Sequence, residues 1–417
     1  MHIDVPTSWQ SSLLDKLGVL VREGQLLQIY GALPSVFPTG RPDDIPNIGR
    51  DTAAGHFVYA RQLGIETNYL ANGRRGSRYF SQYSEKVREY FTWITHELRP
   101  DLITVSDPEL QVVLYQEFGW DSFCISTISG IRDRRGLERW LEATKGCGTV
   151  RSLVLHHDVT QRDWQEIREM AEAASNYGIR AKLMMTESCY GDCPVRQAHY
   201  AFVGQAAGLR PALDPFQVSC ILKRLTNPGS LLDLAGFITP EELHTGSDES
   251  GIDGFKITGR SCSADWVSRA CDYYFSGRSP RNLFEIIVFT SPFLRETLGM
   301  EVEQLFYLDS EAYREYSAQA RKLQPSDRSS FTEETAIRLY QSGLLKINDP
   351  RARYSEHKGK LTLEVLGEYA SMLRSRILGD ERGKLGSKIY NLVIAEPRIS
   401  DRTLTSMIAG ANYSNDC

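Results

Sequence analysis

The sequence predicts an α/β fold: a (β/α)8 TIM-like barrel followed by a mostly helical C-terminal extension. Short apolar runs alternate with longer amphipathic stretches through residues 20–310, a pattern typical of parallel β-α-β units. There are eight such runs, and eight units favour a closed barrel over an open sheet. No G-x-G-x-x-G follows the first run, which argues further against an open dinucleotide-binding sheet.

Each predicted strand is a short apolar run followed by polar residues or glycine. The eight strands are expected at 26–33, 65–73, 101–108, 122–129, 151–160, 179–188, 251–260 and 282–291. The helices between them have apolar residues at helical spacing, and Gly64 ends the first of them. They are expected at 51–64, 84–98, 109–119, 135–146, 161–178 and 263–277.

The 417 residues divide into three parts. Residues 1–19 are an N-terminal segment, 20–310 the barrel domain and 311–417 a C-terminal extension with a partly disordered tail at 405–417. Within the extension, the spacing of apolar residues predicts helices at 311–323 and 361–378, and loops at 323–334 and 348–360.

Composition narrows the class of protein. The hydrophobic fraction of 41% and the charged fraction of 24% are ordinary for a globular domain. A net charge of −5 gives no electrostatic case for a nucleic-acid partner. The apolar runs are too short to span a bilayer, and the N-terminus lacks the basic-then-apolar order of a signal peptide. We therefore expect a cytoplasmic protein without a membrane partner, where close cysteine pairs serve as metal ligands or redox groups more often than as disulfides.

Four cysteines are expected near one rim of the barrel. Cys189 directly follows the sixth predicted strand and Cys193 lies one turn beyond, whereas Cys262 follows the seventh strand. Cys220 lies in the long excursion between those two strands. Four soft thiolates suit an iron–sulfur cluster or a tetrahedral zinc ion. Unpaired thiols packed as small apolar groups are the alternative, and the spacing alone leaves both open.

Two segments carry a resemblance to a known family. "TESCYGDCPVRQAH" at 186–199 is similar to the pattern N-[EN]-G-C-x3-C-P-[FV]-R-x2-H, and "GIDGFKITGRSCSADW" at 251–266 to G-[IV]-D-x-[FL]-K-[IL]-x-G-R. These patterns belong to the U32 peptidase-like family, once named collagenase-like proteases. The segments at 30–42 and 60–73 also read like the first two barrel strands of that family, so the resemblance covers about 20–310. Thr186 and Ser188 replace the usual asparagine and glycine, which affects the ligand loop and not the ligands.

The resemblance implies a barrel that carries a cysteine-held cluster. We expect a [4Fe–4S] cluster on Cys189, Cys193 and Cys220, with Cys262 as the fourth ligand by barrel geometry. A three-cysteine cluster with an open iron is one alternative, and zinc is another. Several family members are similar to oxygen-independent hydroxylation proteins, and others were described as proteases.

Further polar residues are assigned to the same rim. Glu187 and His199 are expected to handle protons, and Arg260 to bind an anion at the end of a strand. The other residues that we expect to contact substrate are Asn68, Asn72, His156, Arg196 and Lys256.

From these residues and the resemblance together, we expect an iron–sulfur oxidoreductase of a biosynthetic pathway. It would carry out redox chemistry or oxygen-independent hydroxylation on a small molecule. A U32-type peptidase is one alternative, although no protease motif is visible and a cysteine that ligates iron is not free to attack a peptide. A non-catalytic subunit that binds a cluster and docks a second protein through its extension is the other.

Overall fold

The chain is described by a computed structural model. It covers residues 1–35, 37, 39, 47–74, 80, 84–191, 193–205, 216, 219–220, 223–224, 227–260, 262–288, 306–348, 352–357 and 360–365. The tail predicted at 405–417 lies outside these residues.

Eight parallel strands close into a barrel in the order β1-β10-β7-β6-β5-β4-β3-β2, which confirms the predicted TIM-barrel architecture. The strands are β1 (His2–Pro6), β2 (Leu26–Gly31), β3 (Glu66–Ala71), β4 (Leu102–Val105), β5 (Ser122–Ile125), β6 (Thr149–Val154), β7 (Arg180–Met184) and β10 (Gly254–Lys256).

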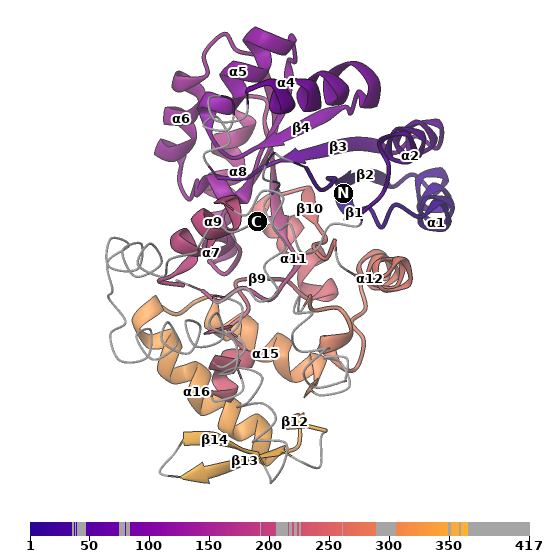
Figure 1. Cartoon of the computed structure of the whole chain (residues 1–417). Helices are drawn as coiled ribbons and strands as arrows, with labels where there is room; N and C mark the ends of the chain where they lie inside the picture. The colour runs from indigo at the N-terminus through magenta and orange to yellow at the C-terminus, as the bar shows by residue number, and fades with distance from the viewer. Residues whose placement is uncertain are drawn as a thin grey trace, which may run out of the picture.

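Helices surround the sheet (Figure 1). They are α1 (Ser11–Arg22), α2 (Arg50–Gln62), α4 (Ser84–Trp93), α5 (Pro108–Phe118), α6 (Arg134–Ala143), α8 (Trp164–Ser175), α11 (Pro240–Ser250) and α12 (Ala264–Ser276).

The first barrel strand comes from the extreme N-terminus, so the prediction of a strand at 282–291 is wrong. β1 pairs with β2 and with β10 and closes the ring, which makes residues 1–19 part of the barrel. The apolar run at 282–291 instead begins with the single turn η5 (Leu283–Glu285). Val288 then touches the sheet edge through one isolated bridge to Glu187.

A polar network crosses the barrel interior. Lys182 donates to the carboxylate of Asp4 at 2.7 Å and to the side-chain oxygen of Gln28 at 3.4 Å. Asn68 donates to the same Gln28 oxygen at 2.9 Å and accepts from Thr104 at 2.7 Å. All five side chains are almost fully buried, so the network links five strands across the barrel interior. Burial opposes the charge of Asp4, but Lys182 and His2 hold its pKa well below the usual range.

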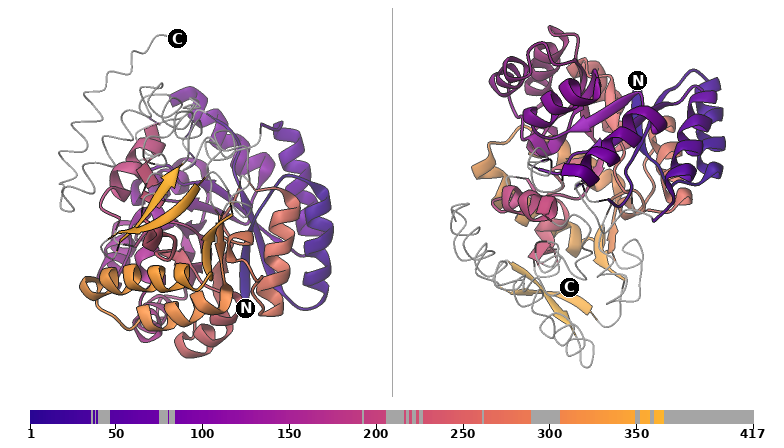
Figure 2. Two further views of the ribbon diagram at one scale, coloured as in Figure 1. Left: turned by 90° about the horizontal axis from the view of Figure 1, so that it is seen from below. Right: turned by 45° about the horizontal axis from the view of Figure 1, so that its top comes forward.

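The extension packs against the barrel from outside. It contains β11 (Phe306–Leu308), α15 (Ser310–Ala320), α16 (Pro325–Gln341), β12 (Leu345–Ile347), β13 (Ala352–His357) and β14 (Lys360–Val365). Figure 1 and the left view of Figure 2 show its helices next to the barrel. α15 matches its prediction, but α16 occupies a predicted loop, and the hairpin of β13 and β14 replaces a predicted loop and the start of a predicted helix.

The buried Arg321 joins the C-terminal extension to the barrel. The guanidinium of Arg321 donates to the backbone oxygens of Thr160 and Arg162 and lies 4.4 Å from the ring of Trp164. These contacts tie the end of α15 to the loop and helix that follow β6.

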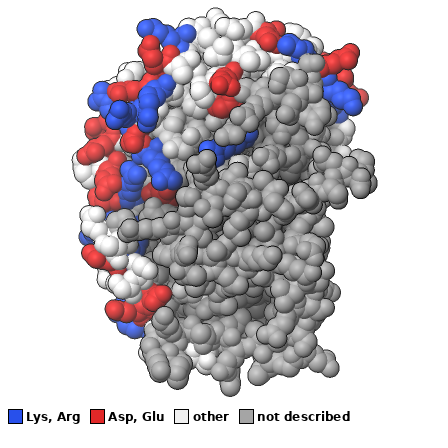
Figure 3. All heavy atoms as spheres, turned by 60° about the vertical axis from the view of Figure 1, so that its left-hand side comes forward, with Lys and Arg blue, Asp and Glu red and all other residues white. Residues whose placement is uncertain are grey.

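On the face shown in Figure 3, basic and acidic side chains of the described residues are interspersed along the left-hand side and the top. Among the helices of the described part, none has the length and apolar character that a membrane span requires.

Candidate functional site

A pocket opens where the barrel strands end. Leu70 of β3, Thr104 of β4, Val154 of β6, Met184 of β7 and Lys256 of β10 contribute to its walls. Parallel strands of a closed barrel all end on the same rim, so residues distant in sequence meet there. The cavity volume is about 110 Å³, several times the ~10–15 Å³ that holds one water molecule. The pocket therefore has room for a small molecule.

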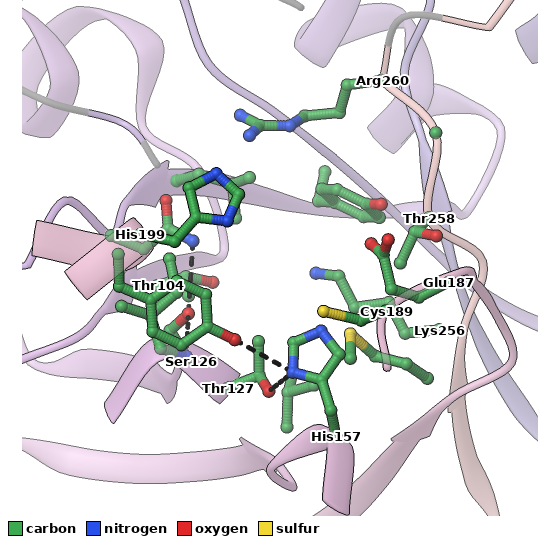
Figure 4. Close-up of a pocket in the computed structure, with 18 residues that line it drawn as sticks. Thr104, Ser126, Thr127, His157, Glu187, Cys189, His199, Lys256, Thr258 and Arg260 are labelled. Carbon is green, nitrogen blue, oxygen red and sulfur yellow. Dashed lines mark hydrogen bonds between the residues drawn. The ribbon is translucent and has the colours of Figure 1, made fainter. Parts of the chain in front are cut away.

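Glu187 reaches this pocket from a short strand beyond the barrel. It belongs to β8 (Thr186–Glu187), which pairs with β9 (Gly236–Phe237), and its side chain is 6% exposed. A Cβ on Gly236 would lie 2.6 Å from the Cβ of Glu187, so the pairing requires glycine there. Figure 4 shows the carboxylate pointing into the cavity, as the sequence predicts.

Arg260 also lines the pocket. It follows β10 after Gly259, whose φ of +107° favours glycine. The Arg260 guanidinium donates to the backbone oxygen of Thr39 at 3.2 Å and borders the cavity. Its predicted position on the rim is confirmed.

His199 also borders the pocket. It lies on α9 (Arg196–Gln205), and its ring stacks on Phe216 with 5.2 Å between ring centroids and 17° between planes. The stacking fixes the plane of the imidazole beside the cavity.

Lys256 is the cation at the base of the site. Its ammonium lies 3.5 Å from the centroid of the Tyr30 ring. Burial lowers the pKa of Lys256 to about 8, although the carboxylate of Asp4 opposes that shift. The predicted contact of Lys256 with the substrate site is consistent with this position.

The two asparagines take different positions. Asn72 lines the pocket and donates to Ser126 at 3.2 Å, while its side-chain oxygen accepts no hydrogen bond from the described residues. Asn68 is fully buried in the interior network and does not line the pocket. The prediction that Asn68 contacts substrate therefore fails, because its β3 position faces the barrel interior below the rim.

Of the two adjacent histidines, the structure places His157 and not His156 at the pocket. β6 ends at Val154, so the strand alternation does not extend to the two histidines. His156 is fully buried and caps α7 (His157–Thr160), accepting from the amide of Asp158 at 3.3 Å. His157 instead borders the pocket, with Nδ1 3.0 Å from the hydroxyl of Tyr200. The predicted substrate contact of His156 is therefore wrong, and His157 is the histidine to consider.

Arg196 does not line the pocket either. It is 2% exposed, pairs with the Asp158 carboxylate at 2.5 Å and donates to the backbone oxygen of Tyr190. Burial opposes its charge, but Cys189, Tyr200, Asp158 and Cys193 raise its pKa. Arg196 therefore organises the cysteine segment from behind, and its burial outside the pocket lining contradicts the predicted substrate contact.

The four candidate cysteines are all partly buried. Cys189 borders the pocket, and Arg196 lies within electrostatic reach of both Cys189 and Cys193. The Tyr190 hydroxyl donates to the backbone oxygen of Cys220 at 2.9 Å, which brings that segment to the same loop. Burial raises the pKa of the Cys193 thiol, while Arg196 opposes the shift.

Cys262 lies apart from this loop, at the turn after β10. Its amide donates to the Gly259 oxygen at 2.9 Å, and its sulfur lies 2.9 Å from the place a Cβ on Gly259 would take. Within the described ranges, no group of three or more His, Cys, Asp or Glu residues is arranged to hold a metal ion. The ligand set named from the sequence thus stays a prediction.

Several hydroxyl groups of the site escaped the sequence analysis. Thr104, Ser126, Thr127, Tyr200 and Thr258 all border the pocket. The only sequence signal for four of them is their place at or just beyond the end of an apolar run. Tyr200 has no such signal, because it comes from a helix outside the barrel.

These observations define the class of protein: a TIM barrel whose strand ends carry a pocket with acidic, cationic, imidazole and thiol groups. This is the rim on which enzymes of that fold build their active sites.

Comparison with known proteins narrows the class. No family model matches the chain. It is 28% identical over 294 residues to "Uncharacterized protease MJ1657" of Methanocaldococcus jannaschii, covering 68% of this chain and 80% of that protein. It also has a likeness to the structure of the U32 peptidase Mk0906, with a TM-score of 0.42 and 13% identity, over 61% of this chain and 90% of that one. The archaeal protein shows that the chain is similar to a protein named a protease, and the barrel itself is shown by the strand pairing.

Proposed function

We propose that this chain is an iron–sulfur-dependent enzyme that carries out a redox reaction or an oxygen-independent hydroxylation on a small anionic molecule. The observation that carries the proposal is the convergence of Arg260, Glu187, His199 and Cys189 on one pocket at the barrel rim (Figure 4). Such a combination offers an anion anchor, two groups that can hold protons and a soft metal ligand.

The charge and size of the pocket favour a small anion. Lys256 and Arg260 border it with positive charge, against the single carboxylate of Glu187. Leu102, Cys124, Val154 and Met184 form a buried apolar cluster, and Val154 and Met184 of this cluster line the pocket. An anionic group held at Arg260 would leave the rest of the molecule near Glu187 and Lys256.

The cluster is assigned to Cys189, Cys193 and Cys220, with Cys262 as the fourth ligand. The positive charge of Arg196 lies beside two of these cysteines and partly offsets the burial that raises the pKa of Cys193. The thiolate is the form that ligates iron. Because the described residues form no ready ligand group, the proposal requires the loop 189–193 and the Cys220 segment to close around the cluster. When bound, a cluster there would supply electron transfer next to the substrate.

The cluster is tested by anaerobic purification followed by iron and acid-labile sulfide analysis and visible spectroscopy. We expect about four iron and four sulfide per chain, and loss of most of both in Cys189→Ser. Cys147→Ser is the matched control, because Cys147 lies in a turn away from the pocket, and it should retain the iron. One equivalent of zinc without sulfide in the wild type would refute the cluster and favour a structural metal.

The anion anchor is tested independently by Arg260→Ala. Removal of a desolvated charged anchor typically costs about 2–5 kcal/mol, so binding of a small carboxylate should weaken at least about tenfold. Lactate titrated into the protein and followed by NMR is a suitable probe. Arg278→Ala, which removes an exposed arginine outside the pocket, should bind lactate as the wild type does. Equal affinities of Arg260→Ala and wild type would remove Arg260 from the site.

A peptidase is the second candidate, because the archaeal relative is named a protease. In this reading Cys189 would be the nucleophile and His157 the base, since both border the same cavity. Hydrolysis of labelled casein by iron-free protein, abolished when iron is restored, would favour this candidate over the first. Activity that appears only after a second protein is added would instead favour a cluster-binding subunit.

A further inference from the structure

The second lysine of the barrel interior has an unusual setting. Lys182 is neutralised by Asp4 at 2.7 Å, but Lys256 forms no ion pair or hydrogen bond with any residue of the described part. Its only direct partner there is the face of the Tyr30 ring. The side chain is 8% exposed, and that exposure is toward the rim pocket. A small molecule in the pocket would therefore meet the Lys256 nitrogen.

The surroundings raise the neutral fraction of the Lys256 amine above that of an ordinary lysine, while the ammonium remains the major form at neutral pH. Burial is the largest cause that lowers the Lys256 pKa to about 8; Asp4 and Cys124 oppose the shift, while the cations Lys182 and Arg260 strengthen it. Near neutral pH a useful fraction of such an amine is uncharged, which is the form that attacks a carbonyl carbon.

The other groups of the pocket complete an arrangement for carbonyl chemistry. In Figure 4, Arg260 and His157 lie at opposite ends of the cavity, and the Glu187 carboxylate and the Lys256 ammonium lie between them. A short molecule anchored at Arg260 by an anionic group would extend into the part of the cavity that Lys256 borders. Glu187 and His157 are then within the same cavity to accept and return protons.

We propose that Lys256 is a nucleophile that forms an imine with a small anionic aldehyde or ketone, of the 2-oxo acid class, whose carboxylate is held by Arg260. In this step the Nζ–C bond forms as the nitrogen adds to the carbonyl carbon. The carbonyl oxygen leaves as one water molecule after it takes up protons, and a C=N bond remains. No oxidant or reductant is consumed. This activity goes beyond the proposed iron–sulfur function and needs none of the four cysteines.

The test uses the full-length protein, pyruvate and sodium cyanoborohydride, which reduces an imine to a stable secondary amine. Intact mass should show one reductively coupled pyruvate per chain, and peptide mapping should place it on Lys256. Because a pKa near 8 leaves far more free amine than the usual pKa of about 10.4, labelling of Lys256 should be at least about tenfold faster than labelling of the exposed Lys145.

Two variants make the test specific. Lys256→Arg keeps the positive charge but cannot form the imine, and it should lose the adduct while its circular dichroism spectrum stays that of the wild type. Lys145→Arg, which changes an exposed lysine, should keep it. Excess lactate, which has no reactive carbonyl, should slow labelling of the wild type.

Labelling that spreads over surface lysines at similar rates, or that persists in Lys256→Arg, would overturn the proposal. Pyruvate binding without any adduct would also overturn it and leave Lys256 as an anion anchor only. Iron content and adduct formation are separate measurements, so the failure of the cluster and the failure of the imine are distinguishable.

Discussion

Replacement of Lys182 by methionine is expected to lower the free energy of unfolding by about 3–5 kcal/mol, the range found when one partner of a buried ion pair is removed. Methionine fills a similar space, so the loss reflects charge. The Asp4 carboxylate would stay fully buried without its partner at 2.7 Å, and Gln28 would lose a donor. Urea denaturation followed by circular dichroism measures the change.

The double variant Asp4→Asn, Lys182→Met separates charge from packing. It should recover part of the loss, because no unpaired charge is then buried. Lys145→Met is the control: it replaces an exposed lysine and should stay within about 0.5 kcal/mol of the wild type. If Lys182→Met is as stable as this control, the interior network does not stabilise the barrel.

Replacement of Asp158 by alanine is expected to destabilise the cysteine segment and the whole fold by a similar amount, about 3–5 kcal/mol. Asp158 pairs with Arg196 at 2.5 Å and with Arg132 at 3.1 Å, and it lies 3.2 Å from His156. Without it, the guanidinium of Arg196, which also holds the backbone of Tyr190, would be buried without an anion. Reduced iron content should accompany the loss of stability if the cluster proposal is correct.

The effect of Asp158 has a defined pH dependence. Burial opposes its charge, but His156, Arg196 and Arg132 hold its pKa well below the usual range. A carboxyl with a lowered folded-state pKa contributes stability that is complete above its unfolded pKa of about 3.9 and is lost as the pH falls toward the folded value.

The difference between wild type and Asp158→Ala should therefore be constant above about pH 5 and shrink below about pH 4. Asp248→Ala removes an exposed carboxylate and should show almost no difference at either pH. A difference between wild type and Asp158→Ala that grows on acidification would contradict the ion-pair account.

Most of the barrel could be predicted because its strands are buried on both faces and read as short apolar runs. The errors arose where this signal misleads. β1 is only five residues long and carries His2 and Asp4 inside the barrel, so it lacks a continuous apolar run. The run at 282–291 is apolar, and most of its described residues up to Val288 are buried. They nevertheless form a turn and an isolated bridge, not a barrel strand. Apolarity reports burial and does not distinguish a barrel strand from another buried segment.

The residues of the candidate site were likewise predictable only where the sequence reveals the strand that they follow. Glu187, Cys189 and Arg260 were predictable on the rim because each follows a strand that the sequence reveals. His156, Asn68 and Arg196 were assigned to substrate because of their residue types, but each is buried in a structural network. His157 and Tyr200 reach the pocket through helices whose orientation no local pattern encodes.

The sequence by itself determined the alternation of strands and helices for seven of the eight barrel strands, the rim position of residues that end those strands and the two motifs that resemble U32 proteins. The tertiary structure alone decided that β1 closes the ring, that Lys182 is neutralised while Lys256 faces the pocket, and that Arg196 supports the cysteine loop from behind. The physical reason is that hydrophobic periodicity is a local property of the chain. The partner of a buried charge is set by which strands become neighbours, and in the case of Asp4 and Lys182 the two residues are 178 positions apart.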